Sequence, residues 1–359
     1  MGVTPKKDKN GTYYVQYRKR DIYGNSIKTT KRGFKTKKEA EKWYARFLLQ
    51  QSSSMDMLFK DFWELYMEDM SSRLKITTLK QKQFKFKKNL LPYFGNVPMN
   101  KITVPMIRKW QNDMMALGYK PTTLKTINNE LHAIMKYAVD YYDLGKSPCD
   151  RAGSMGKSKA DERPHWSYEE FSKFIEAVVN KQDAWLGFNI IYWTGVRVGE
   201  LLALRVSDID FENSEIRIDE TRTVLDGEEL IDTPKTDSSV RVIKIHEELL
   251  TAIREYIDAL YKPKPDTLLF AAHTKRFFEH EMDRGIKISG VKRITVHDLR
   301  HSHASLLLKM GHNFLEISKR LGHGSVRTTI ETYCHAAEDS QERIADSLGK
   351  LDRGDADGV

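Results

Sequence analysis

Two polar stretches rich in small residues divide this chain of 359 residues, so a single continuous core is not expected. The longer stretch, LGKSPCDRAGSMGKSKADERP at 144–164, combines Gly, Ser, Pro and Lys in the manner of an interdomain linker. The shorter stretch is QQSSSMD, at 50–56. We therefore expect domains at 1–52, 53–150 and 165–352, a linker at 151–164 and a charged tail at 353–359.

Positive charge is concentrated in the first 160 residues. Residues 1–50 hold 14 Lys and Arg against 4 Asp and Glu, a net charge of +10, and residues 51–160 hold 18 against 10, a net charge of +8. Residues 161–359 hold 27 against 36, a net charge of −9. A basic segment of this size typically neutralises the phosphates of a nucleic acid, although a merely solvated lysine-rich surface has the same composition.

Other global features favour a reducing, cytoplasmic setting. The two cysteines, Cys149 and Cys334, lie far apart in the sequence, so a disulfide framework is not expected. No stretch approaches the roughly 18–20 apolar residues of a membrane span. The N-terminus MGVTPKKDKNGTYYVQYRKR lacks the apolar core of a secretory signal. We expect a cytoplasmic protein without membrane contact.

The segment 10–35 alternates as a β-strand does. In GTYYVQYRKR, Tyr13, Val15 and Tyr17 share one face, and the other face carries Tyr14, Gln16, Arg18 and Arg20. The turn signal DIYGNS and a capping box opening KKEAEKWYARFLLQ complete a predicted three-stranded sheet covered by one helix. Such a sheet can enter the major groove of DNA. The candidate contacting residues are Gln16, Arg18, Arg20 and Lys28.

Helical periodicity dominates the rest of the chain. Residues 55–150 contain amphipathic segments such as LFKDFWELYMEDM and the basic TTLKQKQFKFKKNLLPYF, which predict a four- or five-helix bundle. A second capping box, Ser167 with Glu170, opens a domain whose helices are interrupted by the strand-like runs SEIRID, TRTVLD and SVRVIKI. We therefore expect a multidomain, mainly α protein with small β-sheets: a three-stranded sheet plus helix, a helical bundle and an α+β domain.

The segment WTGVRVGELLALR, at 193–205, contains the first residue with a candidate chemical role. Arg197 follows a Thr–Gly turn and precedes an apolar helix, so its guanidinium and the positive end of the helix can bind one phosphate together. The simpler alternative is that Arg197 forms an ion pair with Glu200 or Glu170.

The stretch TVHDLRHSHAS, at 295–305, holds three histidines and an arginine within seven residues. On a helix, His297, Arg300 and His301 share a face, whereas His303 falls on the apolar stripe, where a packed or hydrogen-bonded core histidine is expected. Because the three histidines do not converge, a zinc site would need ligands from elsewhere. His297 and Arg300 together suit an anion better than a metal cation.

Two further candidates lie in IDTPKTDSSVRVIKI and KRLGHGSVRTTIETYCHA. Lys235 occupies the tip of a predicted hairpin, a position where most lysines are simply solvated. His323 follows a Leu–Gly helix stop, and Tyr333 lies ten residues later on the next helix. A single tyrosine is usually structural, but this one follows two arginines, a lysine and two histidines in a chain with the charge profile of a DNA binder.

The order Arg…Lys…His-x-x-Arg…His…Tyr resembles the signature of the tyrosine recombinase (phage integrase) family. It is carried here by TGVRVGELLAL, TPKT, HDLRH, LGHGS and TTIETY. Residues 1–50 resemble the arm-type DNA-binding domain of integrases from phages and conjugative transposons, and residues 55–150 resemble their helical core-type DNA-binding domain. The resemblance implies a tyrosine recombinase catalytic domain at 165–352, with the catalytic set Arg197, Lys235, His297, Arg300, His323 and Tyr333.

The resemblance also implies a reaction. Tyr333 would attack a DNA phosphate, form a 3′-phosphotyrosyl link and release a 5′-hydroxyl. The two arginines would bind the non-bridging oxygens, and His323 would add a hydrogen bond. His297 would accept the phenol proton, and Lys235 would protonate the leaving oxygen. The cations can replace a divalent ion and the covalent link conserves the phosphodiester energy, so we expect no metal, no ATP and no other cofactor.

Partners follow from the same resemblance. Joining two duplexes takes four strand cleavages, so we expect a homotetramer on double-stranded DNA, with separate modules for core and arm attachment sites and an excisionase or DNA-bending helper. The run AAEDSQERIADSLGKL carries Ile344, Leu348 and Leu351 at helical spacing. We expect it to dock on a neighbouring protomer; the alternative is packing on its own domain. The implied role is integration or excision of a prophage or conjugative transposon through a Holliday junction.

Three other kinds of protein are alternatives to a tyrosine recombinase. A type IB topoisomerase uses similar chemistry, but two N-terminal DNA-binding modules and a docking segment favour assembly at specific sites. A DNA-binding protein without activity is disfavoured because all six catalytic residue types are present. A zinc protein would lose activity or folding in a chelator and regain it with zinc.

Overall fold

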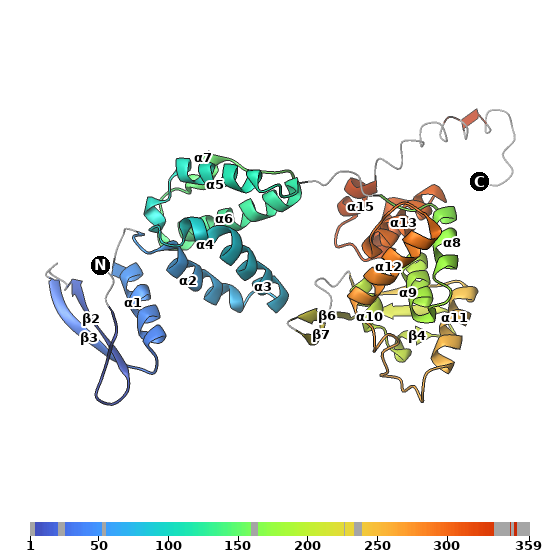
Figure 1. Ribbon diagram of the computed structural model, residues 1–359, viewed down its shortest axis with the longest axis horizontal. Coiled ribbons are helices and arrows are strands. Elements are labelled where there is room, and N and C mark those ends of the chain that lie inside the picture. The colour runs from blue at the N-terminus through green and yellow to red at the C-terminus, as the bar shows by residue number, and fades with distance from the viewer. Residues whose placement is uncertain are drawn as a thin grey trace. The chain divides into compact units, whose positions relative to one another are not determined.

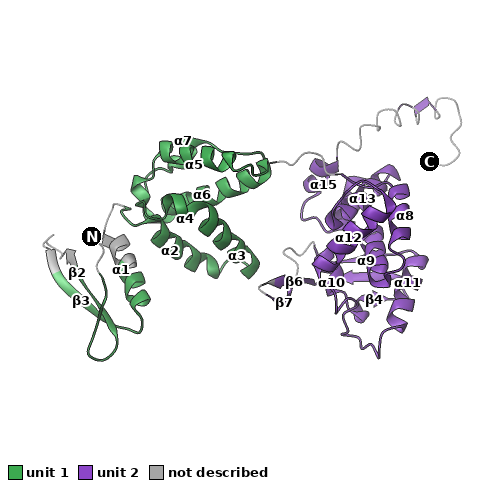
Figure 2. Cartoon of the chain, in the orientation of Figure 1, with its two compact units in different colours: residues 1–161 green, residues 162–359 purple. Residues whose placement is uncertain are grey.

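The computed structural model describes residues 4–20, 26–51, 55–158, 164–225, 227–232, 239–333, 345, 348 and 349, with only the backbone described at 18–20, 26–27, 45–51 and 225. The chain forms two compact units, Met1–Asp161 and Glu162–Val359 (Figure 2). No helix in the described ranges combines the length and apolar composition that a bilayer crossing requires.

The first unit begins with an antiparallel sheet in the order β1-β2-β3 (Figure 1). Helix α1 packs on one face, where Val15 is fully buried and the ring of Tyr17 lies edge-on to Trp43, with 5.1 Å between ring centroids. The predicted sheet, helix and inward face are confirmed. The bounds are β1 (Lys6–Lys7), β2 (Tyr13–Arg20), β3 (Ser26–Phe34) and α1 (Lys37–Gln51).

The other face of this sheet carries the positions predicted to contact DNA. In the register of β2 and β3, Gln16 lies opposite Thr30 and Arg18 lies opposite Lys28, so all four positions share one face. Lys28 is exposed and Gln16 is half-buried. The side chains of Arg18 and Arg20 lie outside the described part of the structure.

The remainder of the first unit is a helical bundle, as predicted, but its described residues form six α-helices and not the expected four or five. Its longest helix, α6, is held by a buried stripe at helical spacing, Leu124, Ile127, Leu131, Ile134 and Ala138. The helices are α2 (Phe59–Ser71), α3 (Ile76–Lys85), α4 (Leu91–Phe94), α5 (Val104–Ala116), α6 (Pro121–Tyr142) and α7 (Pro148–Ala152), with a π-helical turn at Phe86–Leu90 and a 3₁₀ turn at Met99–Lys101.

The second unit is built around α9, which is apolar on nearly all sides and contacts α8, α10, α11, α12 and α13. Its helices are α8 (Tyr168–Ala177), α9 (Gln182–Thr194), α10 (Val198–Ala203), α11 (Glu247–Asp258), α12 (Lys275–Ser289), α13 (Val296–Lys309), α14 (Phe314–Leu321) and α15 (Val326–Tyr333), with a 3₁₀ turn at Val206–Asp208. Its strands are β4 (Ile209–Asp210), β5 (Glu215–Ile218), β6 (Thr221–Leu225), β7 (Glu228–Asp232) and β8 (Arg241–Lys244). The expected mixture of helices and small sheets is confirmed.

The segment that carries Lys235 is not the tip of a hairpin. Strand β7 pairs with β6, whereas β8 pairs with β5 in the antiparallel sheet β4-β5-β8. The strands on either side of residues 233–238 therefore belong to different sheets, and the predicted hairpin is wrong. Lys235 itself lies outside the described residues.

Most of the predicted docking segment also lies outside the described residues. Ile344 and Leu351 belong to that part of the chain, and Leu348 is described as exposed. The docking of this segment on another protomer stays a prediction.

Candidate active site

Helix α13 positions three of the residues singled out from the sequence. It begins after Thr295, whose backbone N–H and hydroxyl donate hydrogen bonds to the Asp298 carboxylate at 2.8 and 2.7 Å. This start places His297 in the first turn and Arg300 and His301 three and four residues later. The three side chains therefore lie on one side of the helix, as the helical spacing predicts.

Arg300 is a buried cation. Its Nη1 donates to the carbonyl of Gly195 at 2.7 Å and its Nη2 to the carbonyl of Leu321 at 2.6 Å. No carboxylate in the described ranges forms an ion pair with it. Burial, together with the nearby charge of Arg197, lowers the pKa of Arg300 to about 9. The guanidinium stays charged at neutral pH and is a candidate for binding an anion.

Arg197 lies immediately before α10 and is partly exposed. Its Nη1 contacts Oε1 of Glu200 at 2.6 Å, which confirms the ion-pair alternative for Glu200. Glu170 pairs instead with Lys292 at 3.2 Å. The ion pair does not exclude phosphate binding, because 37% of the Arg197 side chain is exposed and a guanidinium has further donors.

Arg241, at the start of β8, shares the carboxylate that holds Arg197. Its Nη2 donates to Oε2 of Glu200 at 2.8 Å, and its Nε donates to the carbonyl of Arg320 at 2.9 Å. Burial alone would raise the pKa of Glu200, but Arg241 and Arg197 outweigh burial and hold that pKa below its ordinary value. No sequence pattern points to Arg241, because the partners are 41 positions apart.

Tyr333 ends α15 and is only 5% exposed. Its hydroxyl lies 2.7 Å from Nδ1 of His301. The ring of His297 packs edge-on against His301, with 5.3 Å between the ring centroids. The tyrosine hydroxyl therefore contacts His301, which shares the predicted face of α13 but had received no role from the sequence.

His323 follows α14, which ends in the left-handed residue Gly322 at φ 66°. Its Nδ1 lies 2.8 Å from the hydroxyl of Thr329, an interaction that orients the ring. Burial, followed by the charges of Arg300 and Arg197, lowers the pKa of His323 to about 4. The imidazole is therefore neutral at pH 7 and suited to hydrogen bonding.

His303 is the core histidine that the apolar stripe predicts. It is 2% exposed, and its Nε2 accepts a hydrogen bond from Nε of Arg320 at 3.1 Å. Burial, with the nearby charge of Arg320, lowers the pKa of His303 to about 3. The ring is neutral and serves packing.

Five of the six predicted catalytic residues lie close enough to influence one another electrostatically. Arg197 and Tyr333 both affect the pKa of Arg300, and Arg300, Arg197 and His297 all affect that of His323. The sixth lies outside the described residues. No group of three or more His, Cys, Asp or Glu within the described ranges is placed to hold a metal ion. Cations around a tyrosine hydroxyl can bind a phosphate and stabilise charge that develops on it.

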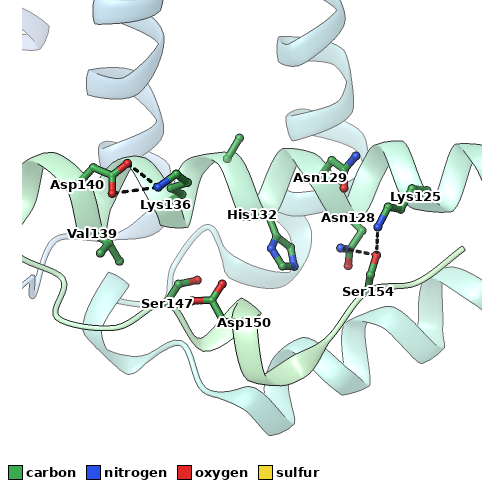
Figure 3. Close-up of a pocket in the computed structure, with 11 residues that line it drawn as sticks. Lys125, Asn128, Asn129, His132, Lys136, Val139, Asp140, Ser147, Asp150 and Ser154 are labelled. Carbon is green, nitrogen blue, oxygen red and sulfur yellow. Dashed lines mark hydrogen bonds and ion pairs between the residues drawn. The ribbon is translucent and has the colours of Figure 1, made fainter. Parts of the chain in front are cut away.

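A separate pocket of about 440 Å³ lies in the first unit, between α6 and the segment around α7 (Figure 3). Its two lysines have partners: Lys125 donates to the hydroxyl of Ser154 at 2.8 Å, and Lys136 pairs with Asp140 at 3.0 Å. None of the predicted catalytic residues lines it. The group of arginines and histidines around Tyr333 in the second unit is therefore the stronger candidate active site.

Three family profiles match successive parts of the chain. The arm DNA-binding domain matches residues 5–51, the phage integrase N-terminal SAM-like domain matches residues 58–115, and the phage integrase family matches residues 167–340. The last match spans the described cluster from Arg197 to Tyr333.

Solved integrases share the fold. One is the Tn1549 transposon integrase in complex with transposon right end DNA, with a TM-score of 0.69 and 21% identity over 80% of this chain and 99% of that one. A lambda integrase tetramer bound to a Holliday junction has a TM-score of 0.57 and 18% identity over 90% and 96% of the chains. In sequence, the ICEBs1 integrase of Bacillus subtilis (strain 168) is 30% identical over 97% of this chain and 100% of the relative. With this similarity along its length, the chain belongs to the phage integrase family of tyrosine recombinases, which are DNA breakage and rejoining enzymes.

Proposed function

We propose that this chain is a site-specific recombinase that cleaves and rejoins double-stranded DNA through a 3′-phosphotyrosyl intermediate and a Holliday junction, integrating or excising a mobile element. The observation that carries the proposal is the buried Tyr333, whose hydroxyl lies 2.7 Å from Nδ1 of His301 and which lies within the electrostatic reach of Arg300. A phenol is a weak nucleophile at neutral pH, so it needs a proton acceptor and nearby positive charge.

Each polar group of the site has a separate role at the phosphate. Arg197 and Arg300 bind the two non-bridging oxygens, where charge develops in the transition state. His323, neutral at pH 7, donates a hydrogen bond to the same group. Lys235 protonates the leaving 5′ oxygen. No metal ion is needed in this scheme, since the protein's own cations offset the phosphate charge.

The acceptor of the phenol proton belongs to a pair of histidines. His297, predicted as the acceptor from the motif, lies against His301, whose Nδ1 contacts the hydroxyl of Tyr333. Both stand on α13, on the side that faces the tyrosine. One member of this pair takes the proton.

We also propose an oligomeric state, a cellular location and a role for each domain. The lambda integrase tetramer solved on a Holliday junction supports a homotetramer on DNA. We place the protein in the bacterial cytoplasm, with an excisionase or DNA-bending protein as helper and the C-terminal segment docked on a neighbouring protomer. The modules are an arm-site domain at 1–52, a core-site domain at 53–150, a linker at 151–164, the catalytic domain at 165–352 and a tail at 353–359.

The direct test is covalent capture of DNA by Tyr333. A cleavable duplex is first selected by its covalent attachment to the protein from a pool of random-sequence duplexes, and is then nicked near the cleavage point so that rejoining is blocked. We expect an adduct that survives denaturation with the intact protein and none with Tyr333→Phe, because phenylalanine has no nucleophilic oxygen. Tyr261→Phe is the control, since Tyr261 is 89% exposed. An adduct of undiminished yield with Tyr333→Phe contradicts the proposal.

Two further outcomes separate the alternatives. Efficient relaxation of a supercoiled plasmid that lacks the selected sequence would favour a type IB topoisomerase. Tight binding of the selected duplex without any adduct from the intact protein would favour a DNA-binding protein without activity.

A further inference from the structure

We propose that His301 is a catalytic residue and takes the proton of the Tyr333 hydroxyl directly. This inference rests on the proposed function and deepens it. Its basis is geometric: Nδ1 of His301 and the tyrosine oxygen lie 2.7 Å apart, a distance at which a proton moves along an existing hydrogen bond.

The neighbouring basic groups are engaged elsewhere. Both terminal nitrogens of Arg300 donate to carbonyls, and an arginine stays protonated at neutral pH. Nδ1 of His323 contacts Thr329, and Nε2 of His303 accepts a hydrogen bond from Arg320. In the part of the chain that the structure describes, Nδ1 of His301 lies within hydrogen-bond distance of the reacting oxygen.

The step requires a defined tautomer. Before attack, Nδ1 of His301 carries no proton and accepts the hydrogen bond from the hydroxyl, while Nε2 carries the ring proton. The bond between the tyrosine oxygen and phosphorus then forms as the bond between phosphorus and the 5′ oxygen breaks. The phenol proton moves to Nδ1, which leaves an imidazolium, and the leaving oxygen takes its proton from Lys235. Rejoining reverses the transfer, so His301 returns the proton to the departing phenol.

His297 has a different role from that of His301. Its ring meets His301 edge-on, so it supports the orientation of that ring from one turn earlier on α13. His297 therefore supports the ring of His301, and His301 touches the reacting atom.

The decisive comparison is between His301→Asn and His301→Ala. An asparagine amide occupies the place of Nδ1 and can still hydrogen-bond the tyrosine hydroxyl, but it cannot take a proton. We expect both variants to slow covalent adduct formation by about 10²–10⁴-fold, the usual loss of a general base, with unchanged affinity for the selected duplex. His280→Asn is the matched control, since that side chain is 77% exposed on α12, and it should cleave at the rate of the intact protein.

A second substrate identifies which proton is affected. In a duplex whose leaving 5′ oxygen is replaced by sulfur, the leaving group needs no protonation. We expect the sulfur substrate to restore cleavage by Lys235→Ala but not by either His301 variant, because their defect lies in the attacking group. Wild-type-like cleavage by His301→Asn, or rescue of the His301 variants by sulfur, would overturn the proposal and leave His301 with a positioning or leaving-group role.

Covalent capture with the intact protein and with the His301 variants distinguishes failure of the recombinase function from failure of the role of His301. If the intact protein forms no Tyr333-dependent adduct, the proposed recombinase function is wrong. If it forms the adduct and the His301 variants form it equally fast, only the assignment of His301 is wrong. Thermal unfolding of each variant shows whether a slower rate reflects loss of the fold, because a variant that is folded in the assay unfolds cooperatively at a temperature above that of the assay.

Discussion

At the scale of single residues, Glu200 organises the cationic side of the site. Its carboxylate accepts from the backbone N–H of Arg197 at 2.9 Å and from its guanidinium, and also from Arg241. It is 3% exposed, so its charge is stable only because two arginines accompany it. The same contacts fix where Arg197 presents its remaining donors.

Replacing this carboxylate by an amide should therefore be costly. We expect Glu200→Gln to lower the free energy of unfolding by about 3–5 kcal/mol, the usual effect of removing one partner from a buried ion pair, and to slow cleavage by the misplaced Arg197. Urea unfolding at pH 7 measures the first effect. The control is Glu279→Gln, which removes an exposed pair with Lys275 and should change stability by less than about 1 kcal/mol.

The pH dependence of that loss has a defined sign. Because the folded pKa of Glu200 is held below its ordinary value of 4.5, its stabilising contribution is complete above that value and is lost as pH falls through the folded pKa. The difference in stability between the intact protein and Glu200→Gln should thus be constant near neutrality and shrink in acid. A difference that persists unchanged well below pH 4 would contradict the role of the charge.

The sequence motifs predict which residues form the candidate active site better than they predict the contacts between those residues. The order of residue types points to Arg197, His297, Arg300, His323 and Tyr333, which the structure gathers within electrostatic reach. The contact between His301 and Tyr333 joins positions 32 apart, and helical spacing settles only which face His301 occupies. Partners that meet through tertiary packing leave no local pattern in one sequence.

At the scale of elements, the end of α9 sets the position of Arg300. Gly195 adopts φ 71° there, and its carbonyl accepts from Arg300. A Cβ at this position would lie 2.6 Å from Cδ2 of Leu321 and 2.7 Å from Cδ2 of His303. The turn therefore needs glycine both for its left-handed backbone and for the close approach of α13 and α14.

A pair of glycine variants separates these two requirements. Gly290 ends α12 at φ 69° with nothing within 4 Å of a Cβ, so Gly290→Ala should cost only the left-handed strain of about 1–2 kcal/mol. Gly195→Ala adds the clash, about 1–3 kcal/mol more, and should slow cleavage as Arg300 shifts. Melting temperature and adduct yield measure both effects. Equal losses in the two variants would contradict the packing role.

Element boundaries were predictable where the signal is local and not where strands pair at a distance. The capping box of Ser167 and Glu170 forms at the start of α8 as expected. The hairpin around Lys235 fails because β7 and β8 each find a partner in a different sheet. Strand partners are chosen by packing across the domain, which alternation within one strand does not encode.

At the scale of the whole molecule, charge and chemistry occupy different parts of the chain. The net charge of +10 lies in residues 1–50, whereas Tyr333 and the arginines that accompany it lie in the segment whose net charge is −9. From this division we expect affinity for DNA to come largely from the first unit and cleavage to be performed by the second. A substitution in one unit should therefore change DNA affinity without changing cleavage, and a substitution in the other should do the reverse.

The sheet β1-β2-β3 of the first unit, here called the arm sheet, offers the sharpest test of that division. Substituting alanine for Gln16, Arg18, Arg20 and Lys28 removes three cations. For DNA that engages this sheet, the slope of log affinity against log salt concentration should therefore fall by up to about 2.7, because each phosphate that is no longer neutralised contributes about 0.9. Cleavage of a short duplex that carries only the selected core sequence should stay within about twofold, because that duplex does not engage the arm sheet. Tyr333→Phe should show the reverse, an unchanged salt slope with no adduct. An arm variant that loses core cleavage in proportion to its affinity would mean that the two activities are not divided between the units.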